Sequence, residues 1–272
     1  MLKNRSKLIT LLLFLIVPLA KAQTTNIEKY RLDKDTSHIL MGNVGFGFSS
    51  KKQQNIVQQY TGNLNLAYLS KLHSYMTINY CNLQQLNKTS FVSEGYTHFR
   101  VNFYRRHLVS YEPFVQYQYD LGRGLLHREL AGVSARINLF RNRSDKDKDK
   151  FTIGISTGVM YEDEFWKGHV LRFEVKNDTN HAHTQFIKST TYLFGKAALH
   201  EKITLFSTIY YQARFEKFFN PRIVSDVQLM FKITKVLSFN TEFASTVDTL
   251  PIVTGNVFTY RFSGNFFIKL NN

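Results

Sequence analysis

Nine histidines are the most versatile chemical groups in this chain, and two of them stand close together. His181 and His183 are separated by one alanine, with Asp178 nearby, and an extended segment would project both imidazoles to the same side. A zinc site normally needs three or four ligands of the Cys, His, Asp or Glu type. No cysteine and no further acid stands at ligand spacing. We therefore expect this segment to be a solvated loop on the outer side of the protein, with no bound metal.

Hydrolytic catalysis would need a nucleophile, a base and an orienting acid that converge in space. The chain contains no Gly-x-Ser-x-Gly and no His-Glu-x-x-His motif. His127, beside Arg128 and Glu129, is also expected in an outer loop. The sequence therefore predicts no catalytic residues and no cofactor.

Polar residues alternate with apolar ones along several segments. Between Thr97 and Phe103, His98, Arg100 and Asn102 occupy every second position. Successive residues of a strand point to opposite faces, so such a set shares one face. The predicted inward-facing residues of a barrel are His98, Arg100, Asn102, Asp120, Arg136, Asn138, Glu162, Glu242 and Arg261. They could form a salt-bridge network that fills a narrow lumen, or line a small pore for anionic solutes.

The clearest alternation lies on either side of a charged turn, Arg141–Lys150. Every odd position from 131 to 139 is Ala, Val, Ile or Leu, whereas positions 134, 136 and 138 are Ser, Arg and Asn. The segment from 151 to 162 repeats the pattern. An arginine that alternates with valine and isoleucine in a long strand indicates lipid on one face and a wet interior on the other. The fold class is therefore all-β, an antiparallel transmembrane barrel.

Twelve strands follow from the same pattern. They are expected at Ile39–Ser49, Gln59–Leu69, Ser74–Asn82, Tyr96–Arg105, Pro113–Asp120, about 130–140, about 151–162, Lys188–Lys196, Lys202–Gln212, Ser225–Ile233, Leu237–Thr246 and Val257–Leu270. In the third strand we expect Met76, Ile78 and Tyr80 outward, with Thr77, Asn79 and Cys81 inward.

The connections predict the orientation. Those after even-numbered strands are mostly short, as at Ser70–His73, whereas longer ones are expected at Leu83–Glu94, Asp163–Thr184, Ala213–Val224 and Val247–Asn256. Outer-membrane barrels have short periplasmic turns and longer outer loops. We therefore expect both termini on the periplasmic side.

The first 22 residues resemble a secretory signal peptide. Lys3, Arg5 and Lys7 precede an apolar run, and Ala20-Lys21-Ala22 supplies small residues for cleavage. Residues 23–37 are expected to be a periplasmic segment, and residues 38–272 the barrel. The signal segment carries four basic residues and no acid, so without it the formal charge falls from +15 to +11. A single cysteine, Cys81, excludes an intramolecular disulfide.

A motif within the alternating region also resembles a known family. Tyr-Asp-x₄-Leu-x₂-Arg-x-Leu-x-Gly-x₃-Arg, from Tyr119 to Arg136, precedes Gly-x₂-Tyr-Glu-x-Glu, from Gly158 to Glu164. The pattern is similar to outer-membrane barrels typified by the salt-induced outer-membrane proteins, and Ser134 stands where such relatives often carry a second glycine. The resemblance implies a barrel in the outer membrane of a Gram-negative bacterium and implies no reaction.

Three functions remain open. The chain could be a non-enzymatic barrel with a structural, stress-related or solute-passage role. It could be a surface receptor or adhesin that uses loops 163–184 and 247–256. It could also be a lipid-modifying enzyme with an inward or rim histidine. The expected partners are outer-membrane lipids and the barrel-assembly machinery. We expect a monomer and no nucleic acid.

The strands with lipid-compatible faces, together with the export signal, give the first prediction. The protein should fractionate with the outer membrane, and its migration in detergent gels should change on heating because a folded barrel resists detergent. Recovery as a soluble periplasmic protein without detergent would contradict the architecture.

Overall fold

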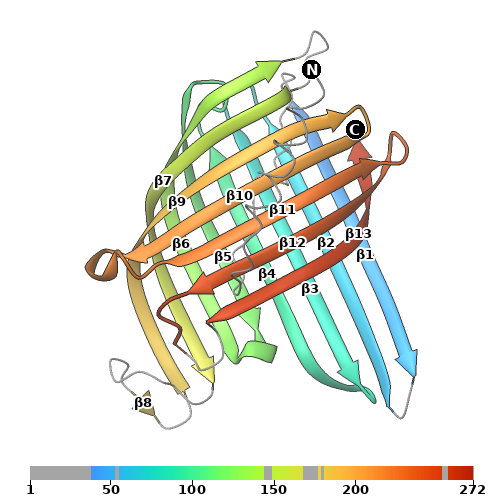
Figure 1. Cartoon of the computed structure of the whole chain (residues 1–272), viewed down its shortest axis with the longest axis vertical. Coiled ribbons are helices and arrows are strands. Elements are labelled where there is room, and N and C mark those ends of the chain that lie inside the picture. The colour runs from blue at the N-terminus through green and yellow to red at the C-terminus, as the bar shows by residue number, and fades with distance from the viewer. Residues whose placement is uncertain are drawn as a thin grey trace, which may run out of the picture.

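The chain forms one closed antiparallel barrel of twelve strands, with a short additional strand, β8, beside it (Figure 1). The computed structural model describes residues 38–52, 55–143, 149–167, 177–178, 181–252 and 257–271. The expected signal peptide, the expected periplasmic segment and residues 144–148 of the charged turn lie outside these residues. None of the described helices is long and apolar enough to span a membrane.

The strands follow one another around the barrel in chain order. They are β1 Ile39–Lys52, β2 Ile56–Leu69, β3 Ser74–Leu86, β4 Thr89–Asn102, β5 Val109–Asp120, β6 Leu125–Arg143, β7 Asp149–Lys167, β8 Asn177–Asp178, β9 His181–His200, β10 Ile203–Arg214, β11 Arg222–Lys232, β12 Leu237–Asp248 and β13 Phe258–Asn271. Two 3-10 turns, η2 Leu121–Arg123 and η3 Phe215–Lys217, connect strands. β9 pairs with β7 and β10, and β13 pairs with β1, which closes the ring. The prediction of twelve barrel strands is confirmed.

The distribution of side chains is the reverse of that in a water-soluble protein. Outward-facing Phe46, Phe262 and Val115 are 75%, 71% and 53% exposed, whereas inward-facing Glu112 and Glu162 are 0% exposed. Alternation produces this result because each strand has one apolar and one polar face. The apolar faces together cover the outside of the barrel, and the polar faces form its interior.

The third strand was predicted with its faces exchanged, and this prediction is wrong. Met76 and Ile78 are buried in the interior, where they pack with Ala67 and Phe267, while Cys81 lies exposed on the outside. The register explains the inversion, because Ile78 pairs with the inward-facing Asn65 of β2. The interior is apolar at this level, so the rule that apolar residues face outward fails there.

The predicted long loop Leu83–Glu94 is also wrong. β3 and β4 continue as a tight hairpin whose two turn residues are Asn87 and Lys88. Their φ angles are 50° and 70°, as in the turns that match the twist of a two-residue hairpin. Asn87 also accepts a hydrogen bond from the backbone N–H of Ile56, at 2.9 Å, which ties the hairpin to β2.

Several predicted strands extend further than expected. The segment predicted at Lys188–Lys196 is β9, which runs from His181 to His200 and pairs with nearly all of β7. The predicted loop 163–184 therefore shortens at both ends. Thr and Tyr fall on both faces of β9, which hid its length in the sequence, whereas its pairing with β7 fixes that length.

The two faces of β2 give a matched test of the architecture. Leu64 faces outward and is 40% exposed, whereas Thr61 faces the interior three residues away. Leu64→Arg should destabilise the barrel by about 2–4 kcal/mol because it places a charge against lipid near the middle of the strand. Thr61→Arg should assemble nearly normally. Folding yield and urea unfolding in lipid vesicles measure the difference, and equal values would refute the assigned faces.

Candidate functional site

The nine predicted interior residues all lie on inward faces of the strands, and most are buried. His98, Arg100, Asn102, Asp120, Arg136, Glu162 and Glu242 are buried, while Asn138 and Arg261 are half-buried. The structure does not gather them at one point. They are divided among two charged clusters and a cavity.

The first cluster is a network of six charges, Arg128, Glu162, Glu164, Lys188, Arg222 and Asp248. Glu162 forms ion pairs with Arg128 of β6, Lys188 of β9 and Arg222 of β11. Arg222 also contacts Glu164 at 3.3 Å and Asp248 at 2.8 Å. Three acids therefore balance three bases in the interior, and strands far apart in the barrel wall are joined across the lumen.

Apolar residues cover this six-charge network. Trp166 donates a hydrogen bond from Nε1 to Glu164, at 3.1 Å, and packs with Leu125, Ala182 and Ile252. Ile252 comes from the segment between β12 and β13, which therefore reaches the barrel mouth. The space left beside Lys188 and Arg222 is a cavity of about 20 Å³, enough for about one water molecule. This side of the lumen is filled.

The second cluster surrounds Glu112 of β5. Arg100 donates to Glu112 at 2.7 Å, Asn102 donates to its other oxygen, and Tyr192 of β9 donates at 3.2 Å. Tyr192 reaches across the lumen, because β6 and β7 lie between β5 and β9. Nearby, the Arg136 guanidinium lies 4.0 Å from the centroid of the Phe194 ring. These contacts fill the part of the barrel enclosed by β4 to β9.

Gly154 makes the Arg136 contact possible. A methyl group at this position would overlap the Phe194 ring, so only glycine leaves room for the ring beneath Arg136. Arg136 also donates to Asn138 at 2.6 Å. The arginine therefore contacts an aromatic face and an amide oxygen, and both interactions favour a buried cation.

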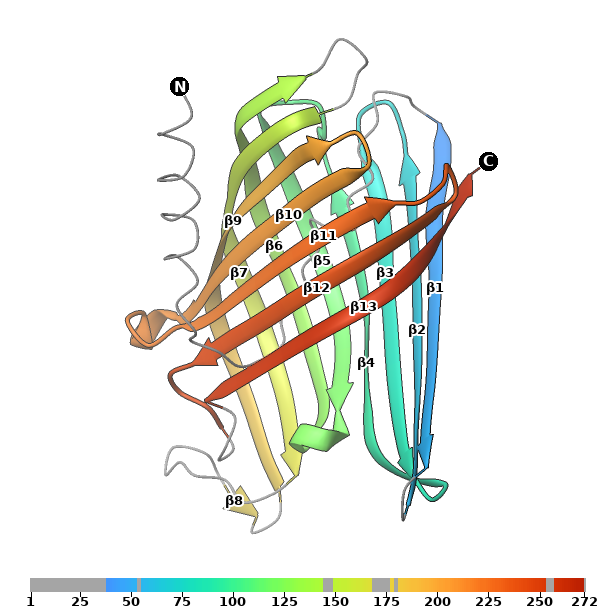
Figure 2. The ribbon, with the colours of Figure 1, turned by 45° about the vertical axis from the view of Figure 1, so that its right-hand side comes forward.

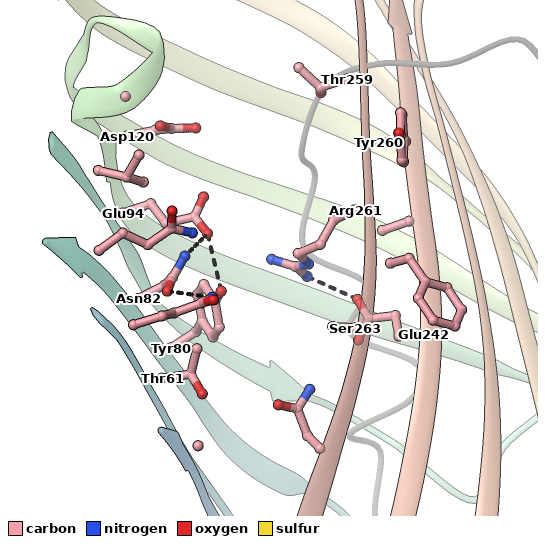
Figure 3. Close-up of a pocket in the computed structure, with 18 of the residues that line it drawn as sticks. Thr61, Tyr80, Asn82, Glu94, Asp120, Glu242, Thr259, Tyr260, Arg261 and Ser263 are labelled. Carbon is pink, nitrogen blue, oxygen red and sulfur yellow. Dashed lines mark hydrogen bonds and ion pairs between the residues drawn. The ribbon is translucent and has the colours of Figure 1, made fainter. Parts of the chain in front are cut away.

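Besides the two clusters, the interior contains a cavity of about 770 Å³ between β1–β5 and β12–β13, which we call the seam cavity (Figure 3). Figure 3 shows Glu94, Asn82 and Tyr80 on one wall and Arg261 with Glu242 on the other. Glu94 accepts hydrogen bonds from Tyr80 at 3.1 Å and Asn82 at 2.9 Å. Arg261 donates to Glu242 at 2.9 Å.

The η2 turn forms one edge of the seam cavity. Asp120 caps this turn by accepting a hydrogen bond from the Arg123 backbone at 3.2 Å, and the two side chains lie 3.7 Å apart. Burial lowers the pKa of Arg123, and the Asp120 carboxylate opposes that shift. The guanidinium stays charged at neutral pH because the ordinary pKa of arginine exceeds 12.

The histidines do not assemble a site. His127 and the pair His181 and His183 lie in β6 and β9, so their predicted placement in outer loops is wrong. Strand pairing includes all three residues, because β6 begins at Leu125 opposite Asp120 of β5 and β9 pairs with β7 from His181 onward. His183 contacts Asp163 at 2.8 Å on the outer surface. Within the described ranges, no group of three or more His, Cys, Asp or Glu residues could hold a metal.

Several interior charges were missed from the sequence. Glu112 stands in phase with Gln116 and Gln118, and a strand extended past Pro113 would have included it. Proline faces outward in this strand. Arg222 falls within the expected loop Ala213–Val224, but in the structure it begins β11 and carries three ion pairs. The signal that could have identified both residues is a charged side chain at a strand end that continues the alternation of the inward-facing residues.

No protein-family model and no curated protein matches the chain. Three solved barrels are similar in outline. The NanC porin has 8% identity, covering 85% of this chain and 98% of its own, with a TM-score of 0.44. The translocator domain of autotransporter NalP from Neisseria meningitidis has 9% identity, 85% coverage of each chain and a TM-score of 0.45. The β-domain of the Bordetella autotransporter BrkA has 9% identity, covering 86% and 98%, with a TM-score of 0.36. The function therefore rests on this chain's own residues.

The six-charge network predicts a large effect from a small substitution. Glu162→Gln should destabilise the barrel by about 3–5 kcal/mol, because it leaves Arg128, Lys188 and Arg222 with too little negative charge in a buried site. Glu129→Gln, the same change at an exposed residue of β6, should have an effect within about 0.5 kcal/mol. The single tryptophan, Trp166, reports urea unfolding by fluorescence. Equal midpoints for the two variants would contradict the network.

Proposed function

We propose that this chain is a non-enzymatic β-barrel of the Gram-negative outer membrane, with a lumen closed to free diffusion and a structural or stress-related role. The observation that carries the proposal is the combination of an apolar exterior with an interior filled by paired charges. The proposed location is supported by the outer faces, where large apolar side chains are exposed around the barrel. Water-soluble monomers rarely expose apolar surface on this scale.

The orientation is proposed from the connections. β1 begins and β13 ends at the same end of the barrel, because Met41 pairs with Asn271. Turns at that end are short, such as 201–202 and 233–236, whereas 168–180 and 249–257 connect strands at the opposite end. We propose that the end with the termini is periplasmic, as in other outer-membrane barrels with short periplasmic turns.

The filled lumen supports a structural role over solute passage. The six-charge network and the Glu112 cluster occupy the part of the barrel from β4 to β11. On the other side, the apolar cluster of Ala67, Met76, Ile78 and Phe267 lies between the seam cavity and the end with the termini. A continuous aqueous path would have to cross one of these packed regions. A stress-related role agrees with the resemblance to salt-induced barrels, which stays a prediction.

The interior histidine gives no support to catalysis. His98 is buried, lies 3.0 Å from the side-chain oxygen of Gln116 and stacks against Phe114. In a catalytic arrangement a carboxylate would orient the imidazole and a nucleophile would face it. Among the described residues, His98 has neither partner. We further propose that the protein is a monomer, inserted by the barrel-assembly machinery and surrounded by outer-membrane lipids.

Planar-bilayer recordings test the closed lumen. Reconstituted wild-type protein should give no steady conductance, because paired side chains occupy the path. Arg136→Ala should lower the free energy of unfolding by about 1–2 kcal/mol through loss of the cation–π contact, without opening a large pore.

Insertion is verified independently by the heat-modifiable migration, in detergent gels, of the protein taken from the same vesicles. A steady wild-type current that favours anions, and loses that preference in Arg136→Ala, would show a pore and overturn the closed lumen. A large cation-selective current would overturn it as well.

A further inference from the structure

The barrel closes between its first and last strands through only four residue pairs. Only Met41–Val44 pair with Ile268–Asn271, whereas the whole of β1 pairs with β2. In Figure 2, β1 runs along the barrel while β13 crosses it obliquely, so the two meet near the end with the termini and separate toward the opposite end. The described remainder of β1 therefore has no β13 partner, and the barrel wall has a lateral gap.

The seam cavity lies behind this gap. Gly47 and Ser49 of β1 and Arg261 and Ser263 of β13 belong to its lining. Phe48, Tyr260 and Phe262 also border it, although they are 62%, 64% and 71% exposed. A cavity bordered by outward-facing residues of both strands is continuous with the outer surface of the barrel. Its mouth is apolar and aromatic, and its interior is polar.

Glu94 points to a positively charged ligand group. This side chain is 8% exposed and accepts hydrogen bonds from the uncharged groups of Tyr80 and Asn82. Among the described residues, no cation lies within ion-pair distance of it. The guanidinium of Arg261 acts on this carboxylate only from across the cavity. An ammonium group in the cavity would give the buried carboxylate the direct ion pair that it lacks.

The opposite wall offers donors for an anionic group. Arg261 uses one terminal nitrogen for Glu242, and its buried Nε has no hydrogen-bond partner. Thr246, which is 1% exposed, also lines the cavity with a hydroxyl that has no partner. The hydroxyl of Thr259 is a third such group. Buried donors without partners are uncommon in folded proteins, and an acceptor inside the cavity would satisfy them.

We propose that the seam cavity binds the headgroup of a membrane amphiphile that carries both an ammonium and an anionic group, with its apolar chain passing outward between β1 and β13. The ammonium lies toward Glu94 and the anionic group toward Arg261 and Thr246. A volume of about 770 Å³ is in the range of small-molecule sites and accommodates such a headgroup. The inference rests on the membrane location in the proposed function. It does not depend on whether the other half of the lumen is filled.

Binding of a fluorescent lysophosphatidylethanolamine to the purified protein in neutral maltoside micelles tests the headgroup site. Glu94→Gln should weaken binding by about tenfold or more, because it removes a charge-assisted hydrogen bond. Thr246→Val, which keeps the side-chain shape, should weaken binding by about threefold or more. The matched controls are Glu129→Gln on the outside of β6 and Thr241→Val on the outward face of β12, and both should bind as the wild type does.

Each variant is first checked for heat-modifiable migration, so that loss of binding is separated from loss of folding. If Glu94→Gln and Thr246→Val are folded and bind the probe as tightly as the controls, the headgroup site is refuted. A second lysolipid, in which a negatively charged group replaces the ammonium, should bind the wild-type protein at least tenfold more weakly than lysophosphatidylethanolamine does. Equal binding would refute the role of Glu94.

The path of the chain is tested with the same lysolipid carrying a photoreactive diazirine at the end of its acyl chain. Cross-links should concentrate on β1 around Phe48 and on β13 around Tyr260 and Phe262. Labelling spread evenly over the outer surface would overturn the lateral path. Phosphoethanolamine without a chain should compete at least tenfold more weakly than the lysolipid, and equal competition would also overturn it. A wild-type pore in planar bilayers would refute the closed lumen alone, so the two failures are distinguishable.

Discussion

The interior of this barrel depends on the charge balance around Glu162. Its carboxylate is fully buried and forms ion pairs with Arg128, Lys188 and Arg222 from three different strands. An ion pair in such a place contributes little when complete and costs several kcal/mol when one partner is lost. The need to keep every partner around Glu162 therefore restricts the spacing of the strands more than it adds to their stability. β6, β9 and β11 must keep the spacing at which all three cations reach one carboxylate, and that spacing leaves no room for water to pass on this side.

Much of the fold could be predicted from the sequence because a period of two is strong wherever the interior is polar. Ser134, Arg136 and Asn138 share a face, and the structure turns that face inward. The same rule fails in β3, where Met76 and Ile78 belong to an apolar part of the interior. The local pattern gives two faces but does not say which one is inside. The register with β2 decides which face of β3 points inward, because Ile78 pairs with the inward-facing Asn65. That register cannot be obtained from the sequence of β3 alone.

The candidate site was predictable only in part, for a related reason. Glu162 and Glu164 lie in one motif and share a face, so their inward direction follows from alternation. Their partners Lys188 and Arg222 lie 26 and 58 positions further along the chain from Glu162 and Glu164, respectively. Contacts across a lumen depend on strand tilt and register, which the sequence of one strand does not contain. The tight turn at Asn87 similarly hid the ends of β3 and β4, because polar hairpin residues resemble a loop.

The seam cavity begins where the pairing of β1 with β13 ends. Gly45 follows Val44, the last residue of β1 that pairs with β13, and a Cβ at this position would be 3.0 Å from the carbonyl oxygen of Phe266. Beyond this point the strands separate, so backbone groups of β1 lose their partners on one side. Lipid cannot satisfy such groups, and a barrel edge is tolerated in a membrane only where it lines a polar, water-filled space. The polar lining of the seam cavity, with Ser49, Gln59 and Asn265 beside the gap, provides that space. The filled half of the lumen and the polar seam cavity are therefore complementary: ion pairs across the lumen join the strands on one side of the barrel, and polar side chains line the cavity on the other.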